Sequence, residues 1–522
     1  MGISFSVFTT FAGLLLLSGV LANKLSSRFN MPILLLFLAV GMTVGSGGIG
    51  LVELDPERHA QPINTLGTVA MCFILFSGGL GTRFREIRPI LSGGIVLATF
   101  GVLLTAFFLG ICGYLLFTGF GSHHGLPWWM LMAAIISSTD AAAMFAIMRG
   151  NGVNLSGSLQ PLLELESGSN DPMAALLTLL MLQIVTAAGG FSLWQLPLLV
   201  YKIVCGACTG LILGCIGKRL FSHRFEYEGL YYVLGVSLVL LCFGAAELLK
   251  TNGFLAVYVC GVFMGNMKYN FRSGLEKFNE GIAWLMQVIL FTTLGMLVNP
   301  TELLRPRILI PGVLLSLCMM FLARPAAVFI SLCRSRFSLK EKTLISWAGL
   351  RGAAPIVLAT FPLAAGVEGS KVMFNVVFFM VIGSVLVQGM TLMPFARFLG
   401  LAKPFAVKKR APVEMETVEG ANYELHEFEV REDSALAGMT LAQANLPPGA
   451  LVTMIRRGTG FMPACGSTVI EAGDDLVVMG APDKLHALAR LHFPESQYEE
   501  KQELTHIFKK NIFKRAQDSG EK

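Results

Sequence analysis

Long apolar stretches separated by short polar loops make up the chain as far as about residue 400. A helix needs about 20 apolar residues to cross the hydrocarbon core of a bilayer, and by that measure the sequence predicts about 13 transmembrane helices. The first stretch is followed by Lys24 and Arg28 and has no basic residues before it, which indicates a membrane helix and not a cleaved signal. The expected spans are 5–22, 31–50, 63–80, 89–118, 128–148, 159–188, 195–217, 228–249, 251–267, 281–298, 308–333, 343–366 and 371–394.

The composition agrees with a membrane protein that carries a soluble tail. The 522 residues are 54% hydrophobic and 14% charged, whereas soluble domains carry about 25% charged residues. The net charge of +6 comes from basic residues in the short loops between apolar segments. A lipid bilayer, and not a nucleic acid, is therefore the expected partner of these charges.

The basic residues also predict the orientation of the chain, because loops rich in Lys and Arg stay in the cytoplasm. One set of alternate loops is rich in them: Lys24, Arg28, Arg83, Arg85, Arg88, Arg149, Lys218, Arg219, Arg224, Lys268, Arg272, Lys277, Arg334, Arg336, Lys340 and Lys342. The other set is poorer: Arg58, Lys202, Lys250, Arg305, Arg307 and Lys371. We expect the N-terminus outside and the C-terminus in the cytoplasm, which requires an odd number of spans.

Two of the spans contain polar or glycine-rich interruptions. The fifth carries SSTD at 137–140, and the twelfth carries GLRGAAP at 349–355. The two spans are seven apart in order, so they take equivalent places in two halves of opposite orientation. This spacing is typical of inverted repeats with crossed, broken helices at the bilayer midplane.

The segment ESGSNDPM at 166–173 places carboxylates, a hydroxyl and a carboxamide inside the sixth apolar span. Intramembrane acids are costly and mark ion or proton pathways by default. Oxygen ligands suit a small hard cation. We expect Asp171 to bind either a monovalent cation or a proton, which would give one-for-one exchange; the alternative is a structural acid paired with an Arg.

Four residues are expected around Asp171. Asn170 supplies a neutral carboxamide that can hold the carboxylate or an unwound backbone. Ser167 lies one helical turn earlier and offers an oxygen, although Ser also packs between membrane helices. Thr139 and Asp140 lie at the break of the fifth span, where unwound backbone supplies ligands. Asp140 either titrates or caps a half-helix, and the sequence does not separate these readings.

Glu166, Arg324 and Arg351 are the other deep charges. A lone Arg in lipid is costly, so each is expected to have an acidic partner. We expect Glu166 to form a structural ion pair with Arg324 or Arg351, and Glu166 also lies near the cation site. Arg351 alternatively offsets the dipoles of the broken helix.

Three short patterns do not support other functions. Cys205 and Cys208 form C-x-x-C in a membrane span without a second pair or a nearby His, which argues against a metal or redox site. GSGGIG at 45–50 matches G-x-G-x-x-G but ends a membrane span instead of joining a strand to a helix. TVGSG at 43–47 lacks the aromatic residue and the pore helix of a potassium filter. We therefore predict no cofactor and no enzymatic activity.

The composition changes after Leu399, which divides the chain into a membrane domain (1–400), a basic linker (401–419), a small soluble α/β domain (420–495) and a charged tail (496–522). Within the soluble domain the pattern predicts strands at 424–430, 451–455 and 475–479. It predicts helices at 434–444 and 482–491.

Four motifs resemble the NhaP/CvrA branch of the monovalent cation:proton antiporters: STDAAA (138–143), ELESGSNDPM (164–173), LAVYVCGVFMGN (255–266) and GLRGAAP (349–355). The resemblance implies a 13-helix inverted-repeat fold and a homodimer working by an elevator-like motion. It implies that Asp171 carries the ion and the proton, with Glu166, Ser167, Asn170, Thr139 and Asp140 around it. It also implies core partners Arg324 and Arg351, and the Asn-Asp pair resembles the electroneutral class.

The tail resembles the C-terminal lobe of potassium-conductance regulators, the TrkA-C type, through DSALAGMTL (433–441) and GDDLVVMG (473–480). This implies a self-associating regulatory module with a small regulatory ligand, and it favours potassium and a role in cell-volume and pH control. We expect K⁺/H⁺ exchange, with Na⁺ as a further substrate, at a bacterial inner membrane. The alternatives are a Na⁺/H⁺ antiporter and a regulator-gated cation channel.

Overall fold

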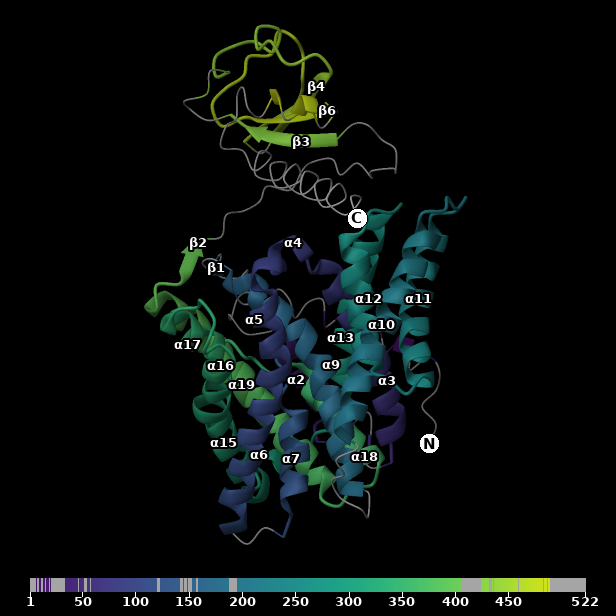
Figure 1. Ribbon diagram of the computed structural model, residues 1–522, viewed down its shortest axis with the longest axis vertical. Coiled ribbons are helices and arrows are strands. Elements are labelled where there is room, and N and C mark those ends of the chain that lie inside the picture. Colours follow the sequence, from purple (N-terminus) through teal and green to yellow (C-terminus); the bar gives the residue numbers. More distant parts are fainter. Residues whose placement is uncertain are drawn as a thin grey trace, which may run out of the picture. The chain divides into compact units, whose positions relative to one another are not determined.

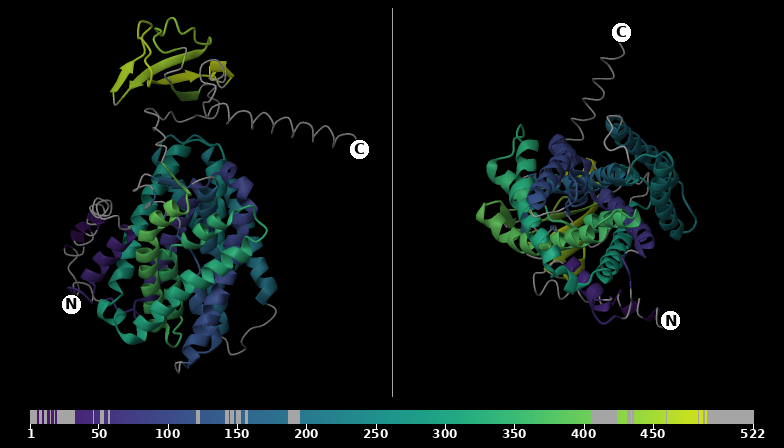
Figure 2. Two further views of the ribbon diagram at one scale, coloured as in Figure 1. Left: turned by 90° about the vertical axis from the view of Figure 1, so that its left-hand side faces the viewer. Right: turned by 90° about the horizontal axis from the view of Figure 1, so that it is seen from below.

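The computed structural model describes residues 33–140, 158–186, 195–404 and 424–488 apart from short gaps, together with scattered positions elsewhere. The chain divides near residue 406 into a large helical unit and a smaller C-terminal unit (Figure 1). In the large unit the helices run side by side, as both directions of view show (Figure 2).

The helical unit follows the apolar spans of the sequence. Its helices are α2 (Ile33–Val44), α3 (Ala60–Gly81), α4 (Phe84–Ile87), η1 (Arg88–Ile90), α5 (Leu91–Val96), η2 (Leu97–Gly101), α6 (Val102–Gly119), α7 (Leu126–Ile135), α9 (Leu159–Thr186), α10 (Gln195–Phe221), α11 (Gly229–Leu248), α12 (Gly253–Asn266), α13 (Arg272–Met296), α14 (Pro300–Leu303), α15 (Pro306–Cys318), η3 (Met319–Ala323), α16 (Arg324–Ser331), α17 (Leu339–Trp347), α18 (Ala353–Ala364) and α19 (Ser370–Phe398). Two short strands, β1 (Val153–Leu155) and β2 (Ala402–Pro404), pair antiparallel.

The predicted helical membrane architecture is confirmed. Six described helices are each long and apolar enough to cross a bilayer: Ala60–Gly81, Arg88–Gly119, Pro197–Phe221, Gly229–Leu248, Pro306–Ser331 and Ser370–Phe398. The expected span 5–22 and the second half of the span 128–148 lie largely outside the described residues.

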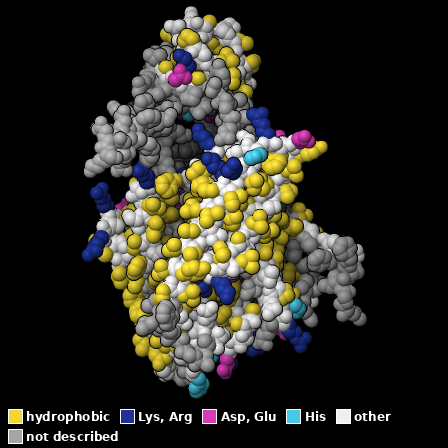
Figure 3. All heavy atoms as spheres, turned by 45° about the vertical axis from the view of Figure 1, so that its right-hand side comes forward, with side chains coloured by type: hydrophobic (Ala, Val, Ile, Leu, Met, Phe, Trp, Pro, Cys, Tyr) yellow, Lys and Arg dark blue, Asp and Glu magenta, His cyan; other side chains and the backbone are white. Residues whose placement is uncertain are grey.

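Large apolar side chains cover the outside of the helical unit. Phe100, Leu115, Ile212, Leu241 and Phe321 are each more than half exposed, and hydrophobic side chains form a broad band over the face in Figure 3. Soluble monomers rarely expose so large a continuous apolar surface. Lipid contact accounts for it, because helices satisfy their own backbone hydrogen bonds and can face hydrocarbon.

The two predicted breaks are present, and they cross. After α7 the chain turns and has no regular secondary structure from Ser138 to Asp140, and between α17 and α18 it has none from Gly349 to Gly352. The Asp140 amide donates to the Leu350 carbonyl at 2.7 Å. The Arg351 guanidinium donates to the Ser138 carbonyl at 2.6 Å. The unwound segments therefore satisfy part of each other's backbone inside the membrane.

Matching irregularities support the inverted repeat. The fourth and eleventh spans, again seven apart, each contain one π-helical turn, η2 and η3. The packing around these turns is reciprocal: α16 packs against η2, and α6 packs against η3. Two halves related by a two-fold axis in the membrane plane produce this arrangement.

The helices form two groups by their packing. In the α3 group (α2, α3, α10–α13), α12 packs against α3, α10 and α11, and α13 packs against α2 and α3. In the α9 group (α5–α7, α9, α15–α19), α9 packs against α5, η2 and α7, and α19 packs against α15 and α18. Both groups contribute to the site described below.

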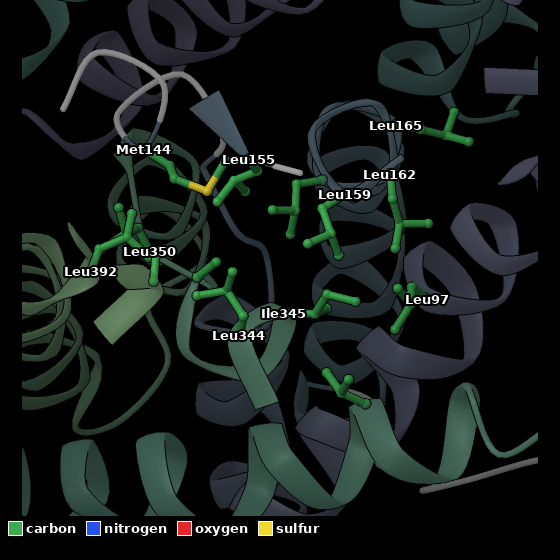
Figure 4. Packing of buried hydrophobic residues seen from close by; sticks show 14 of the residues in the cluster. Leu97, Met144, Leu155, Leu159, Leu162, Leu165, Leu344, Ile345, Leu350 and Leu392 are labelled. Atoms are coloured by element: carbon green, nitrogen blue, oxygen red, sulfur yellow. The ribbon is translucent and has the colours of Figure 1, made fainter. Parts of the chain in front are cut away.

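A buried hydrophobic cluster within the α9 group fixes the first part of α9. Leu159, Leu162 and Leu165 of α9 pack with Leu97 of η2 and Ile345 of α17 (Figure 4). Each of these side chains is at most 4% exposed. The polar motif that follows Leu165 is therefore positioned by the closely packed first turns of α9.

The C-terminal unit contains an antiparallel sheet in the order β3-β6-β4-β5. The strands are β3 (Glu424–Glu429), β4 (Ala450–Arg457), β5 (Gly460–Pro463) and β6 (Asp475–Gly480). The three predicted strands are confirmed as β3, β4 and β6, and β5 was not predicted. Residues of the predicted helix 482–491 that are described, 483–485 and 487–488, are helical.

The predicted helix at 434–444 is wrong. Its described residues form successive turns, and Thr440 pairs as an isolated bridge with Val469. Gly438 has φ +86°, a left-handed conformation that glycine adopts readily and that interrupts a helix. The apolar positions Leu436 and Ala444 still reach the core of the sheet.

Candidate functional site

The polar motif of the sixth span lies in the middle of α9. Pro172 has no amide hydrogen, so the carbonyl four residues earlier, at Gly168, loses its helical partner. Helical spacing puts Glu166 and Asn170 on one face, where both are at most 1% exposed, and Ser167 and Asp171 on the adjacent face.

Side chains of α9 hold the unwound segment after α7. The Asn170 amide nitrogen donates to the Thr139 hydroxyl at 2.5 Å, and the Asn170 oxygen accepts from the Thr139 amide at 3.3 Å. The Ser167 hydroxyl donates to the Thr139 carbonyl at 2.8 Å. Asn170 therefore holds the unwound backbone at Thr139 and not the Asp171 carboxylate.

Residues of α19 hold the second break. The Arg351 amide donates to the Ser384 hydroxyl at 3.2 Å, and that hydroxyl donates to Gln388 Oε1 at 2.6 Å. The Gln388 amide nitrogen donates to the carbonyl of Trp347, the last residue of α17, at 3.1 Å. Buried backbone groups need such partners because an unpaired one is costly in an apolar interior.

Glu166 pairs with Arg324 and not with Arg351. Glu166 Oε1 lies 2.5 Å from Arg324 Nη2, with the side chains 1% and 2% exposed. Arg351 is completely buried and directs its guanidinium to the Ser138 carbonyl. Thus Arg324 forms the ion pair with Glu166, and Arg351 donates a hydrogen bond to the buried Ser138 carbonyl of the first break.

Asp140 and Asp171 line one cavity of about 50 Å³ at the crossing point. That volume admits water or one small cation. Asp171 Oδ1 and the Ser138 hydroxyl are buried, and neither has a hydrogen-bond partner in the part of the chain that the structure describes. The first turn of α18 (Ala353, Ala354, Pro355) also lines the cavity, and a helix N-terminus favours negative charge beside it.

Gly352 makes room for Asp140. A Cβ atom at Gly352 would lie 2.1 Å from Asp140 Oδ2 and 2.6 Å from its carboxyl carbon. Gly349, three residues earlier, is also close-packed, since a Cβ there would lie 2.8 Å from Arg324 Nε. The two glycines of the second break therefore let one acid and one guanidinium approach the backbone closely.

The sequence analysis gave no role to Asn252, Ser384 or Gln388, and it included Ser138 and Gly352 only as parts of the segments SSTD and GLRGAAP. Ser384 and Gln388 are polar residues four apart in an apolar helix, a spacing that signals a shared face. Asn252 caps α12 through the Leu255 amide, and its side-chain nitrogen donates to the Pro172 carbonyl at 2.8 Å. A polar residue directly before the glycine that begins an apolar span is the signal that marks such a cap.

An ion pair between Arg457 and Asp474 stabilises the C-terminal unit. Arg457 donates to both carboxylate oxygens of Asp474, at 2.9 and 2.8 Å. Burial alone raises the pKa of Asp474, but the hydrogen bonds from Arg457 and from the Glu471 amide outweigh it, and the pKa lies below its ordinary value. Asp474 therefore stays ionised at neutral pH and holds its turn against β4.

Carboxylates at the crossing of two broken membrane helices, within inverted repeats, define a secondary transporter of small ions. Residues 13–398 match the family described as "Sodium/hydrogen exchanger, transmembrane", and residues 425–492 match the TrkA-C domain. The chain belongs to this sodium/hydrogen exchanger family and carries a C-terminal TrkA-C domain.

Relatives match most of the chain. It is 36% identical to the K(+)/H(+) antiporter NhaP2 of Shewanella baltica, over 97% of this chain and 86% of the relative. It is 32% identical to the K(+)/H(+) antiporter NhaP of Alkalimonas amylolytica, over 90% of this chain and 80% of the relative. The solved structure of the sodium proton antiporter MjNhaP1 from Methanocaldococcus jannaschii has the same fold, with TM-score 0.62 at 22% identity, covering 74% of this chain and 100% of that one.

Proposed function

We propose that this protein is a secondary active transporter that exchanges K⁺ for H⁺, with Asp171 as the carrier of both. The observation that carries the proposal is the cavity at the crossing of the two breaks, where Asp171 presents a buried oxygen without a protein partner. The names of the relatives that match along most of the chain favour K⁺.

Exchange follows from competition for one carboxylate. An unpaired carboxylate in an apolar surrounding is stabilised by binding either a proton or a cation, and not by both together. Asp171 has no Arg or Lys partner among the described residues, so neither ligand meets a resident positive charge. One carboxylate that returns with one proton or one cation gives electroneutral exchange.

The neighbours have separate roles. Thr139 and Asp140 present backbone and side-chain oxygens at the cavity, and Asn170 and Ser167 keep that unwound segment in place. Asp140 is the second carboxylate of the cation site, while its backbone amide is used by Leu350. Outside the cavity, the Glu166–Arg324 pair ties α9 to α16.

The setting of the transporter follows from its loops and its second domain. The protein lies in a bacterial inner membrane with its N-terminus outside and its C-terminus in the cytoplasm, because alternate loops are rich in Lys and Arg. It works as a homodimer within the lipid bilayer. Its TrkA-C domain is a regulatory module that responds to a small ligand and links exchange to cytoplasmic pH and cell volume.

Sodium is the second candidate substrate. The chain is 27% identical to Na(+)/H(+) antiporter 1 of Methanocaldococcus jannaschii, over 69% of this chain and 83% of that relative. Carboxylate and hydroxyl oxygens bind either ion, so the cation series below decides between them.

The test is proton movement in proteoliposomes with an imposed pH gradient, on adding K⁺, Na⁺ or Li⁺ in turn. We expect K⁺ to collapse the gradient in the wild type and not in Asp171→Asn at equal yield, because the amide cannot exchange a proton. Gly383→Ala is the matched control, since a Cβ at Gly383 meets only Ser316 Oγ at 3.7 Å. Normal exchange in Asp171→Asn refutes the carrier assignment, and single-channel conductance in the purified protein would establish a channel instead.

A further inference from the structure

The cavity beside Asp171 has two walls of different chemistry. The α9 group supplies Ser138, Thr139, Asp140 and Asp171, together with the first turn of α18. The α3 group supplies the opposite wall, which consists of Met71, Ile74, Leu75, Gln287 and Phe291. Among the residues described as lining this second wall, Gln287 has the sole polar side chain.

Gln287 stands out on its own helix. It lies one helical turn before the buried Phe291 on α13, within the apolar sequence AWLMQVILF at 283–291. Moving a carboxamide out of water costs free energy unless a polar partner compensates it. Gln287 is half-buried, and the polar groups that share its cavity include the Asp140 and Asp171 carboxylates and the Ser138 hydroxyl.

A cation at Asp171 needs oxygen ligands on more than one side. Potassium in proteins is surrounded by oxygen dipoles that replace its hydration shell. The α9 wall offers the Asp171 and Asp140 carboxylates and the Ser138 hydroxyl, whereas Met71, Leu75 and Phe291 offer no oxygen from the opposite side. The carboxamide oxygen of Gln287 is neutral, so it contributes a ligand without adding a second exchangeable charge.

We propose that Gln287 is a specificity-determining residue whose side-chain oxygen completes the coordination of the transported cation from the wall opposite Asp171. This inference rests on the proposed exchange function and adds a ligand to the same site. Because Gln287 belongs to the α3 group and the carboxylates to the α9 group, the cation joins the two groups when it is bound. A proton on Asp171 makes no such bridge, so Gln287 acts on the cation and not on the proton.

The expected effect is on cation affinity and selectivity. Gln287→Met keeps the length of the side chain and removes its oxygen. Losing one ligand to a charged group raises the KM for K⁺ about tenfold and changes the maximal rate less. The ratio of the K⁺ and Na⁺ KM values changes too, because the two ions differ in the number of oxygens they accept. Gln287→Glu, which keeps an oxygen there, retains cation binding.

The experiment compares reconstituted wild type, Gln287→Met, Gln287→Glu and Leu285→Ala by initial rates of proton movement over K⁺ and Na⁺ concentration series. Leu285, 40% exposed on the same helix, is the matched control, and we expect its KM values to equal those of the wild type. A KM and a K⁺/Na⁺ ratio in Gln287→Met that equal the wild-type values overturn the inference. If Gln287→Met does not fold, Gln287→Asn replaces it, and an unchanged KM there is equally decisive. A wild type that responds to no cation overturns the proposed function itself.

Discussion

The two broken helices occupy equivalent places in the two halves of the membrane domain, yet they carry opposite chemistry. The first break ends in Asp140 and points polar groups at the cavity. The second carries Arg351, which is completely buried and donates to the Ser138 carbonyl of the first. The two repeats therefore have the same backbone arrangement, but their side chains differ in role. We call the first break (137–140) the ion-binding arm and the second break (349–352) the supporting arm.

The two arms are also held by different helices, and only one of these helices carries Asp171. α9 holds the first break through Asn170 and Ser167, so the helix that bears Asp171 also positions Asp140. The second break is held by Ser384 and Gln388 of α19, through the Arg351 amide and the Trp347 carbonyl. A change in the first arm should act on binding directly, and a change in the second should act through the packing.

The largest effect is expected from the Glu166–Arg324 ion pair, because both of its side chains are buried. The pair lies beside the second break, where Gly349 packs against Arg324. Glu166→Gln leaves Arg324 buried without its counter-charge, and removing one partner of a buried pair costs about 3–5 kcal/mol. We expect a large loss of thermal stability in detergent, measured by the unfolding midpoint of the purified protein.

The double variant Glu166→Gln with Arg324→Met is the control for this prediction. It removes both charges, so it should regain most of the stability that the single variant loses. A single variant as stable as the wild type would show that the pair does not support the second arm.

A somewhat smaller effect is expected where the second arm makes room for the first. Gly352→Ala brings a Cβ atom to 2.1 Å from Asp140 Oδ2, and overpacking of this kind costs about 1–3 kcal/mol. The protein should fold but lose most of its K⁺-dependent proton movement, because relief of the clash displaces Asp140 from the cavity. Transport at the wild-type rate would mean that the position of Asp140 is not important.

The sequence predicted both breaks because polar and glycine-rich segments interrupt long apolar spans. It also singled out Asp140 and Asp171, which line the cavity, since intramembrane acids are rare. The predicted neighbours Asn170 and Ser167 contact the Thr139 backbone instead. It left the partner of Glu166 open between Arg324 and Arg351, because that choice depends on which helices pack together and not on their composition.

Other features depended on tertiary structure more strongly. The short strand β5 has only four residues, and its pairing with β4 spans a tight turn at Gly458 with φ +59°. The turns at 434–444 have helix-like apolar spacing, but the bridge from Thr440 to Val469 and the conformation of Gly438 outweigh that local preference. The sequence did not single out Gln287, because a lone carboxamide in an apolar helix becomes a candidate ligand only when the structure places it across the cavity from Asp171.

The smallest effects are expected from the hydrogen bonds that hold the two arms, and here the comparison is sharpest. Asn170→Ala removes two hydrogen bonds to Thr139, and Ser384→Ala also removes two, one from the Arg351 amide and one to Gln388 Oε1. At about 1 kcal/mol for each bond, the two variants should lose similar amounts of stability. The KM for K⁺ should rise in Asn170→Ala, whereas Ser384→Ala should keep the wild-type KM because its arm does not bind the ion. Equal KM shifts in the two variants would contradict the division into a binding arm and a supporting arm.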